Sequence, residues 1–336
     1  MKVLLTGASG NIGSNTLPEL LKQGHQVRCL VRPSKVNRRK MKQLADKVEI
    51  IWGDMRSQED MRAAMEGQEV IIHLAYIIPP LCLEEPELAR TVNVEGTRNL
   101  LEAAKALARP PKILFSSSLD LFGHTQDQEP PRKVTDPIFA TDAYTEHKLT
   151  CETMLRESGL EWSIFRFADV PPLALRSPHP IMFEIPLNNR IEVIHPYDAA
   201  LAIANGISNP EIWGKIWLIG GGKGCQIYYR DYLGRMLEVM GLGTLPEEAF
   251  THKPYCTDWL DTEASQRLLT YQHSTFDDII ADIAKIAGIR RYLALPVRFF
   301  AQKWLLSMSP YWKQAQHHST GAADEQESIS PPGAQA

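Results

Sequence analysis

The chain has 336 residues, of which 44% are hydrophobic and 23% charged, so it is long enough for one large domain or a main domain with a smaller lobe, and neither disordered nor fibrous. Its formal net charge of -4 gives no overall attraction to nucleic acid or to anionic lipid. We therefore expect no nucleic-acid partner. Five cysteines without C-x-x-C spacing argue against a disulfide framework or a zinc site, so we expect a cytoplasmic protein without a metal.

Short apolar runs alternate with segments of helical spacing from the first residues onward. The predicted strands are Val3–Thr6, Val27–Val31, Val48–Trp52, Val70–Leu74, Ile113–Ser116 and Trp162–Phe167. The predicted helices between them are Thr16–Gln23, Gln58–Glu66, Thr91–Leu107 and Ala143–Glu157. Strands that alternate with helices form a parallel sheet, because right-handed crossovers place the helices on both of its faces. The sequence therefore predicts an α/β fold with a doubly wound parallel sheet.

The regular alternation ends near residue 170, where prolines interrupt the pattern. Two further strands are predicted at Arg190–Ile194 and Lys215–Gly220, flanking a helix over Tyr197–Ile207. We expect a main domain over residues 1–170 and a mixed α/β cap over residues 171–310, with strands that complete the sheet. Residues 317–336 are rich in Gly, Ser, Gln, Pro and acidic residues, so they are predicted to form a disordered tail.

A glycine-rich loop follows the first predicted strand and opens the first predicted helix. Its residues are Gly7, Ser9, Gly10, Asn11, Ile12 and Gly13. Glycines here let the backbone turn tightly and approach a pyrophosphate, while free N–H groups at the helix start face the anion. The position between strand and helix predicts a dinucleotide-binding loop, and with it a Rossmann domain over residues 1–170.

The second predicted strand ends at Arg32, where an enzyme selective for NAD usually carries an acid that holds the adenosine ribose. Basic residues crowd this strand and the following loop: Arg28, Arg32, Lys35, Arg38, Arg39, Lys40 and Lys42. Such a field suits a 2′-phosphate, and Arg32 is best placed for a forked contact. We interpret the cofactor as NADP, with NAD as the alternative. A solvated basic helix face accounts equally well for residues 38–42.

Tyr144 and Lys148 stand four residues apart on one predicted helix, so their side chains project from the same face. A phenol with a pKa near 10 is a poor base at neutral pH, and the neighbouring Lys148 cation favours its phenolate. A phenol in such surroundings can exchange a proton with a neighbouring oxygen atom, and a serine hydroxyl can hold that oxygen in place. Three serines, residues 116–118, end the fifth predicted strand and supply candidates for that hydroxyl.

The G-x-x-G-x-x-G spacing, the serine-rich fifth strand and the Tyr-x-x-x-Lys pair together resemble the extended short-chain dehydrogenase/reductase family, which includes NAD-dependent epimerases and dehydratases. The resemblance covers roughly residues 1–220. It implies an NAD(P)-dependent oxidoreductase whose catalytic residues are Ser118, Tyr144 and Lys148. It also implies that Tyr144 and Lys148 contact the cofactor. Ser118 stands five residues before the glycine of the family's S-x-x-V-Y-G pattern, and Ser117 is the second choice.

The resemblance also implies cofactor contacts after the third and fourth strands. Asp54 and Met55 follow the third strand, where the family commonly has an aspartate near the adenine. Leu74 and Ala75 lie in a stretch similar to the family's H-L-A-A, whose backbone passes along the cofactor, and the next residue is a tyrosine where the motif has a small one. Asn93, in a V-N-V-x-G-T stretch, either fixes backbone or water near the cofactor or bonds within its own helix.

Only about twenty residues separate the sixth strand from Arg190, whereas sugar-nucleotide epimerases of the family usually spend a long segment here. Apolar residues dominate this segment, so the expected substrate is a small hydrophobic carbonyl or alcohol. A nucleotide-sugar epimerase or dehydratase is the first alternative. A non-catalytic NADP-binding protein is the second.

An apolar and aromatic stretch over residues 292–306 needs somewhere to bury, and Arg290, Arg291 and Arg298 lie in or beside it. It has three possible partners: the chain's own cap, another subunit of a homodimer, or a membrane surface on which it lies as an amphipathic anchor. We favour burial in protein over the membrane, because the basic residues form no broad polar face and the overall charge is negative.

Overall fold

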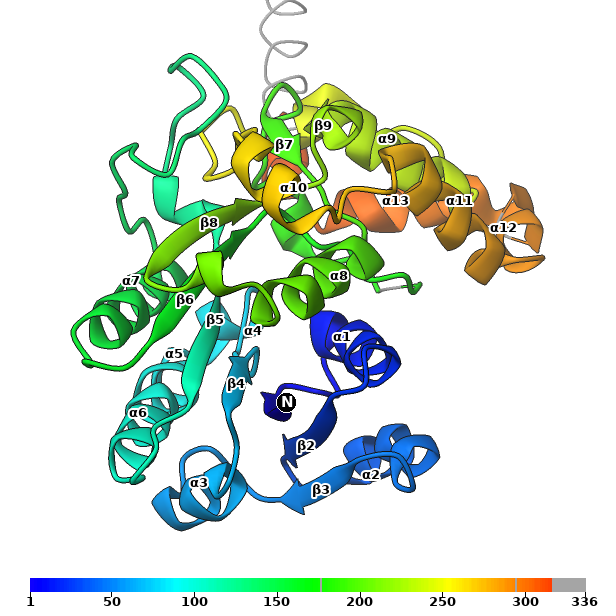
Figure 1. Cartoon of the computed structure of the whole chain (residues 1–336). Helices are drawn as coiled ribbons and strands as arrows, with labels where there is room; N and C mark the ends of the chain where they lie inside the picture. Colours follow the sequence, from blue (N-terminus) through cyan, green and yellow to red (C-terminus); the bar gives the residue numbers. More distant parts are fainter. Residues whose placement is uncertain (176, 294, 316–336) are drawn as a thin grey trace, which may run out of the picture. The chain divides into compact units, whose positions relative to one another are not determined.

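The computed structural model describes residues 1–175, 177–293 and 295–315, in which seven parallel strands form one sheet. The strands are β1 (Lys2–Thr6), β2 (Gln26–Val31), β3 (Glu49–Trp52), β4 (Val70–His73), β5 (Lys112–Ser118), β6 (Trp162–Phe167) and β8 (Lys215–Ile219). Their order is β3-β2-β1-β4-β5-β6-β8, so the winding reverses between β1 and β4 (Figure 1). The predicted doubly wound α/β fold is confirmed, and ligands of such sheets bind where the order reverses.

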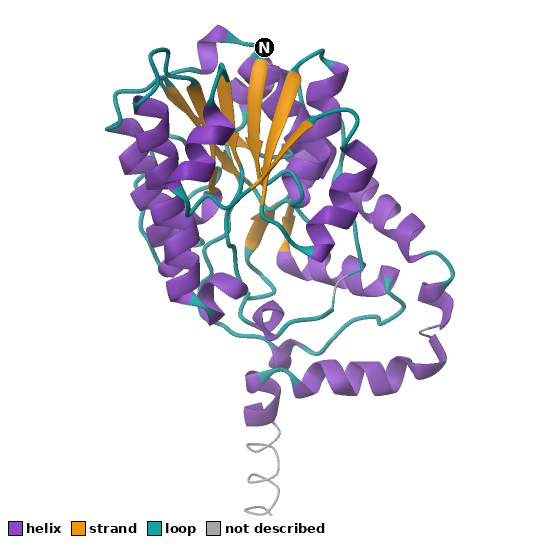
Figure 2. Ribbon diagram, turned by 90° about the horizontal axis from the view of Figure 1, so that it is seen from below, coloured by secondary structure: helices purple, strands orange, loops and turns teal. Residues whose placement is uncertain are grey.

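Helices cover both faces of this sheet (Figure 2). The helices of the N-terminal half are α1 (Asn11–Lys22), α2 (Lys35–Met41), α3 (Gln58–Met65), α4 (Leu81–Glu84), α5 (Pro86–Arg90), the π-helix η2 (Thr91–Glu95), α6 (Gly96–Lys105) and α7 (Ala143–Arg156). Later in the chain come α8 (Pro196–Ile207), α9 (Tyr229–Val239), α10 (Glu263–Leu269), α11 (Phe276–Ala287), α12 (Arg290–Leu293) and α13 (Arg298–Ser307). Short 3-10 turns join several of them.

The core has two halves because neighbouring residues of a strand face opposite sides of the sheet. In β1, Val3 and Leu5 belong to the cluster that α1 and α8 complete, whereas Leu4 belongs to the one that α3, α6 and α7 complete. All three side chains are fully buried. Each contributes roughly 1.5–3 kcal/mol relative to exposure, so continuous apolar strands of this kind hold both helix layers on the sheet.

The chain forms two compact units, and it passes between them more than once. The first unit comprises residues 1–173, 190–226 and 256–279, and the second comprises residues 174–189, 227–255 and those described from 280 onward. The sequence analysis placed a single boundary at residue 170 and gave the later segments to the cap. Residues 190–226 belong to the first unit because β8 pairs with β6 from Ser163↔Lys215 to Phe167↔Ile219, and α8 packs on the sheet.

Two short strands lie outside the main sheet. They are β7 (Arg190–Glu192) and β9 (Gln226–Tyr228), which pair with each other. The strand predicted at Arg190–Ile194 therefore exists in shortened form, but it does not extend the main sheet, and β9 was not predicted. The predicted tail, residues 317–336, lies outside the described residues.

The C-terminal stretch is largely exposed within the single chain. Its aromatic side chains Tyr292, Phe299, Phe300 and Trp304 are 56%, 64%, 72% and 53% exposed, and only Leu305 is fully buried. Packing against the chain's own cap therefore holds for Leu305 but not for these four side chains, and their burial against another subunit stays a prediction. Among the described residues, no helix combines the length and the hydropathy that a membrane span needs.

The first turn of α1 depends on a glycine. A Cβ atom built on Gly13 would lie 2.1 Å from the carbonyl oxygen of Gly7, whereas one built on Gly234 in α9 meets nothing within 4 Å. We expect Gly13→Ala to lower the free energy of unfolding by about 1 kcal/mol or more, since backbone must move. The control Gly234→Ala should raise it by about 0.5–1 kcal/mol through helix propensity. Thermal denaturation of both variants tests this; a Gly13→Ala protein as stable as Gly234→Ala contradicts it.

Candidate active site

The glycine loop joins β1 to α1 at the point where the strand order reverses. Gly7 has φ +75°, and a Cβ atom on it would lie 2.7 Å from the backbone nitrogen of Ala75. Gly10 is the N-cap of α1 and offers no side chain to its first-turn N–H groups. Those groups therefore face outward with partial positive charge, as a bound anion requires.

The other loop residues have distinct contacts. The Asn11 side-chain amide donates to the carbonyl oxygen of Val170 at 2.7 Å, which ties the loop to the segment after β6. Ile12 packs against the core. The Ser9 carbonyl oxygen accepts from Nζ of Lys40 at 2.8 Å. Asn11 and Ile12 thus hold the loop in place, while Lys40 brings a positive charge to it.

Arg32 follows β2 and is exposed. Close to it lies Asp54, whose carboxylate binds the Arg56 guanidinium at 2.7 Å. The hydrogen bond from Arg56, with Arg32 as a further positive charge, lowers the pKa of Asp54. The next residue, Met55, points into the core, where its Cε would be 2.7 Å from a Cβ atom on Gly96. Only the backbone of Met55 is left for a ligand.

The basic residues around β2 differ in their surroundings. Arg28 forms an ion pair with Glu49 at 2.7 Å and donates to carbonyl oxygens at the end of α3, so it is committed to the fold. Arg38 stacks on the Trp52 ring at 4.6 Å. Arg38 and Lys40 thus have contacts within the fold, although they and Arg39 are exposed, so a solvated helix face stays an alternative.

A chain of hydrogen bonds fixes the turn after β4. The Thr6 hydroxyl oxygen accepts from the backbone N–H groups of Leu74 and Ala75, both at 3.2 Å. Asn93 accepts from the Ile77 N–H at 2.7 Å and donates to the Ile77 carbonyl oxygen at 2.9 Å. Of its two interpretations, Asn93 thus fixes backbone beyond its own helix. The segment that carries Leu74 and Ala75 is held beside the glycine loop.

Ser118, Tyr144 and Lys148 meet at the carboxyl end of β5. Ser118 ends the strand, and its hydroxyl lies close enough to the Tyr144 phenol to affect the pKa of that phenol. Lys148 lies one turn further along α7, with Nζ 5.8 Å from the Tyr144 ring centre. The Ser117 hydroxyl, by contrast, is buried without a hydrogen-bond partner among the described residues. The structure therefore brings Ser118, the first choice of the sequence analysis, to Tyr144.

The start of α7 positions the tyrosine. Asp142 is the N-cap, and its carboxylate accepts from the Thr145 N–H at 2.8 Å. The Thr145 hydroxyl in turn accepts from the Asp142 N–H at 3.0 Å, which completes a capping box. The helix therefore begins at a defined residue, and Tyr144 lies in its first turn.

Burial decides the electrostatics of this cluster. Lys148 is buried, donates to the Ser116 carbonyl oxygen at 2.6 Å and lies over the Tyr76 ring at 3.6 Å. Loss of hydration lowers the pKa of Lys148 to about 7. Burial, and the nearby Asp120, raise the pKa of Tyr144, so its phenol holds its proton at neutral pH.

Two residues of the cluster were not predicted as site residues. Tyr76 was noticed only as a departure from a family motif, yet its ring lies beneath the Lys148 ammonium. Asp120 follows Ser118 by two residues, and its backbone N–H donates to the Ser118 hydroxyl oxygen at 3.2 Å. Burial raises the pKa of Asp120 to about 7. Asp120 could have been predicted as a site residue, because the sequence places this acid two residues after the serine-rich end of the fifth strand.

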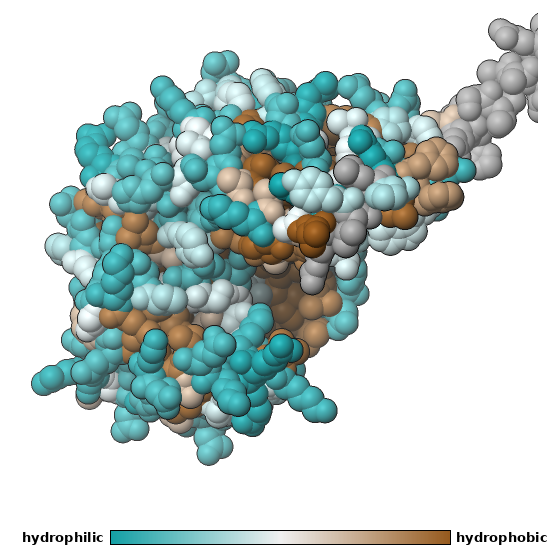
Figure 3. All heavy atoms as spheres, turned by 90° about the vertical axis from the view of Figure 1, so that its right-hand side faces the viewer, coloured by the Kyte–Doolittle hydropathy of each residue, from teal (hydrophilic) through white to brown (hydrophobic). Residues whose placement is uncertain are grey.

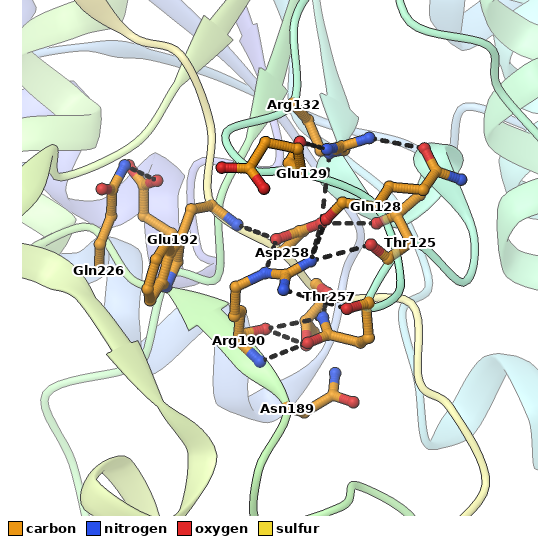
Figure 4. Close-up of polar contacts among 12 residues, drawn as sticks. Thr125, Gln128, Glu129, Arg132, Asn189, Arg190, Glu192, Gln226, Thr257 and Asp258 are labelled. Atoms are coloured by element: carbon orange, nitrogen blue, oxygen red, sulfur yellow. Dashed lines mark hydrogen bonds and ion pairs between the residues drawn. The ribbon is translucent and has the colours of Figure 1, made fainter.

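A second polar network fixes the loop that leads from β5 to α7 (Figure 4). The Asp258 carboxylate accepts from Arg190 at 2.6 Å and from the Thr125 hydroxyl at 2.7 Å, and Arg132 approaches it at 3.3 Å. Asp258 and Arg132 are almost fully buried, so removal of either partner leaves an uncompensated charge. This loop therefore enters α7 from a fixed position.

The arrangement can transfer a proton to or from an oxygen atom placed beside the Ser118 and Tyr144 hydroxyls, with a cation close by. Among the described residues, no group of three His, Cys, Asp or Glu side chains could hold a metal ion. The residues that could hold a dinucleotide lie along the same edge of the sheet, from the glycine loop through Leu74 and Ala75 to Lys148.

Comparison with known proteins identifies the family. Residues 3–171, half of the chain, match the model of the NAD dependent epimerase/dehydratase family. The chain belongs to this family. The match confirms the resemblance drawn from the sequence, and it includes the glycine loop, Ser118, Tyr144 and Lys148.

The individual proteins that resemble this chain share only about a third of its residues over the matched part. Photosystem II assembly factor Ycf39 of Cyanophora paradoxa is 32% identical over 167 residues, which cover 49% of this chain and 44% of that protein. A 3-beta-hydroxysteroid dehydrogenase of Mycolicibacterium neoaurum is 30% identical over 157 residues, 45% of this chain and 41% of that protein. The chain thus matches less than half the length of these two curated relatives.

A solved structure shows the same fold over most of the chain. A short-chain dehydrogenase/reductase superfamily protein from Agrobacterium tumefaciens with bound NAD has a TM-score of 0.69 and 19% identity. The comparison covers 89% of this chain and 100% of that one. The family's fold therefore extends beyond the residues that match its sequence model.

Proposed function

We propose that this protein is an NADP-dependent oxidoreductase that transfers hydride to or from a hydrophobic carbonyl or alcohol. The observation that carries the proposal is the meeting of the Ser118 hydroxyl, the Tyr144 phenol and the Lys148 ammonium at the carboxyl end of β5. Two neighbouring hydroxyls beside a cation are suited to proton transfer at a carbonyl oxygen. The named 3-beta-hydroxysteroid dehydrogenase among the relatives is consistent with an apolar substrate of this kind.

The glycine loop fits a dinucleotide. Its backbone is bare at Gly7, Gly10 and Gly13, and side chains there would collide with neighbouring backbone at Gly7 and Gly13. The uncapped N–H groups of α1 would hold the pyrophosphate, and Arg32 with Lys40 would hold a 2′-phosphate. The cofactor, once bound, supplies or accepts the hydride. The remaining work, which is to orient the carbonyl and move its proton, falls to side chains of this chain.

The surroundings of Tyr144 favour the reductive direction. Its raised pKa keeps the phenol protonated, so it is ready to donate a proton to a developing alkoxide. Ser118 donates a second hydrogen bond to the same oxygen, which stabilises its negative charge. Lys148, in its protonated form, then favours the phenolate that remains. The oxidative direction needs this phenolate at the start and is expected to require higher pH.

Consumption of NADPH separates the candidate functions. With a panel of hydrophobic ketones, the proposed reductase should oxidise one NADPH for each alcohol formed. An epimerase or dehydratase, the alternative that the family's name keeps open, returns its cofactor unchanged and should convert a nucleotide sugar instead. A protein that binds NADPH but converts neither class of compound would overturn the proposal in favour of a non-catalytic binding protein.

Arg32 should set the preference for NADPH over NADH. The guanidinium is exposed beside the third strand's end, and a bidentate contact to a 2′-phosphate is worth about tenfold or more in affinity. We expect Arg32→Ala to lose that preference while its affinity for NADH stays nearly constant. Arg39→Ala, an exposed arginine on α2, is the matched control and should keep most of it. Fluorescence titration measures both affinities, and equal affinities in the wild type contradict the assignment.

A further inference from the structure

A patch of exposed apolar side chains covers the C-terminal helices of the second unit. Its members, here called the aromatic patch, are Ile289, Tyr292, Val297, Phe299, Phe300 and Trp304. Each of them is more than half exposed. Figure 3 looks onto the side that carries α11 to α13 in Figure 1, and hydrophobic side chains gather on that surface. An exposed apolar patch of this extent marks an interaction site.

The aromatic patch faces outward because the opposite side of α13 is bound to the rest of the second unit. Arg298 and Gln302 both donate to the Leu242 carbonyl oxygen, at 3.1 and 2.7 Å, and Leu305 is fully buried. These residues follow each other at helical spacing and so define the inner face of the helix. Phe300 and Trp304, four residues apart, therefore lie on the outer face.

Positive charge accompanies the patch. Between Asp282 and Asp324 the sequence holds six of the chain's 36 lysines and arginines and none of its 40 acidic residues. One of the six, Lys285, forms an ion pair with Asp282, which leaves five. Among them, Lys303 lies on the Phe299 ring, with Nζ 5.5 Å from the ring centre. The negative net charge of the chain resides elsewhere, and salt screens charges that lie more than about 10 Å away. The local charge that a partner meets is therefore positive.

We propose that the aromatic patch binds the surface of an anionic lipid membrane. Aromatic rings buried at the level of the lipid headgroups, with basic residues among them, are the composition of an interfacial helix. The ten residues of α13 are too short to span a bilayer, so the helix lies along its surface. The proposal reverses the preference that the sequence analysis gave to burial in protein.

Two other occupants fit the patch less well. A second copy of the chain, related by a two-fold axis, would bring the same basic surface against itself and place like charges opposite one another. The chain's own residues 316–336 contain one large apolar side chain, Ile329, and so offer little that could cover aromatic rings. An anionic surface supplies both the apolar depth and the opposite charge.

Flotation of the full-length protein with lipid vesicles tests the proposal. We expect it to float with phosphatidylcholine vesicles that contain about 30% phosphatidylglycerol and to float much less with pure phosphatidylcholine. The double variant Phe300→Ser/Trp304→Ser should bind the anionic vesicles at least about tenfold more weakly. Lys303→Gln should lose about fivefold on anionic vesicles and little on neutral ones.

Two control variants change exposed residues outside the aromatic patch. Phe139→Ser removes a similarly exposed phenylalanine of the first unit, and Arg267→Gln removes an exposed arginine of α10; both should bind vesicles as the wild type does. Circular dichroism and thermal denaturation verify that every variant is folded. A wild type that stays with neither vesicle, or a double variant that floats like the wild type, overturns the proposal. So does a wild-type dimer that the double variant turns into a monomer, since a second copy then covers the patch.

Discussion

Tyr144→Phe is expected to lower turnover about a hundredfold or more while the affinity for NADPH stays nearly constant. The substitution removes only the phenolic oxygen. That oxygen lies beside the Ser118 hydroxyl, and its raised pKa makes it the proton donor of the proposed reduction. The ring itself stays in place, because it packs edge-on against Tyr76 with ring centres 6.0 Å apart. Steady-state kinetics with a ketone substrate and a separate cofactor titration measure the two quantities.

Tyr76→Phe is the matched control for this variant. It also removes one hydroxyl from a largely buried tyrosine of the same cluster, but that hydroxyl faces the Cys151 thiol at 3.8 Å and takes no part in the proposed proton transfer. Its ring remains beneath Lys148, so we expect turnover within a few fold of the wild type. If Tyr144→Phe retains near-normal turnover, or if both variants lose it equally, Tyr144 is not the proton donor.

The sheet could be predicted because most of its strands have a clear pattern in the sequence. Parallel strands buried on both faces are continuous apolar runs, such as Val70–His73, and each is followed by a helix with one apolar stripe. The pair β7 and β9 carries no such signal, because each strand has only three residues. The strand predicted at Lys215–Gly220 does complete the sheet as β8, although local sequence does not reveal that its neighbour is β6, a pairing that depends on the whole fold.

The positions of Tyr144 and Lys148 could be predicted, because helical spacing places their side chains on one face. The contacts of other site residues could not, because they depend on segments that are distant in the sequence. Arg28 looked like a phosphate ligand in the sequence, yet it pairs with Glu49 and carbonyl groups that lie at least twenty residues away. Lys40 reaches the glycine loop from a helix that sequence alone allowed to be solvated. The apolar stretch over residues 292–306 was recognised in the sequence, but its partner was not decided, because hydrophobicity predicts a need for burial and not the partner that meets it.

Lys148→Met is expected to abolish measurable turnover and yet to raise thermal stability at neutral pH. The variant loses the cation that favours the phenolate of Tyr144, and the family resemblance implies a cofactor contact as well, so affinity for NADPH should also fall. Stability should rise because the wild type keeps Lys148 buried at the cost of its hydration. We expect an increase in the melting temperature of about 5 °C at pH 6.

The stability gain of Lys148→Met should depend on pH, whereas a gain from better packing alone would not. The folded protein binds the Lys148 proton with a pKa of about 7, whereas the unfolded chain holds it up to the ordinary lysine value of 10.5. Between these values the unfolded state binds more protons, so this group makes the wild type more stable as pH rises. The gain of Lys148→Met should therefore be largest below pH 7 and shrink by about pH 9. The control Lys22→Met replaces a largely exposed lysine and should melt with the wild type at every pH. A gain that does not change with pH would show that Lys148 is not held in the core as a costly charge.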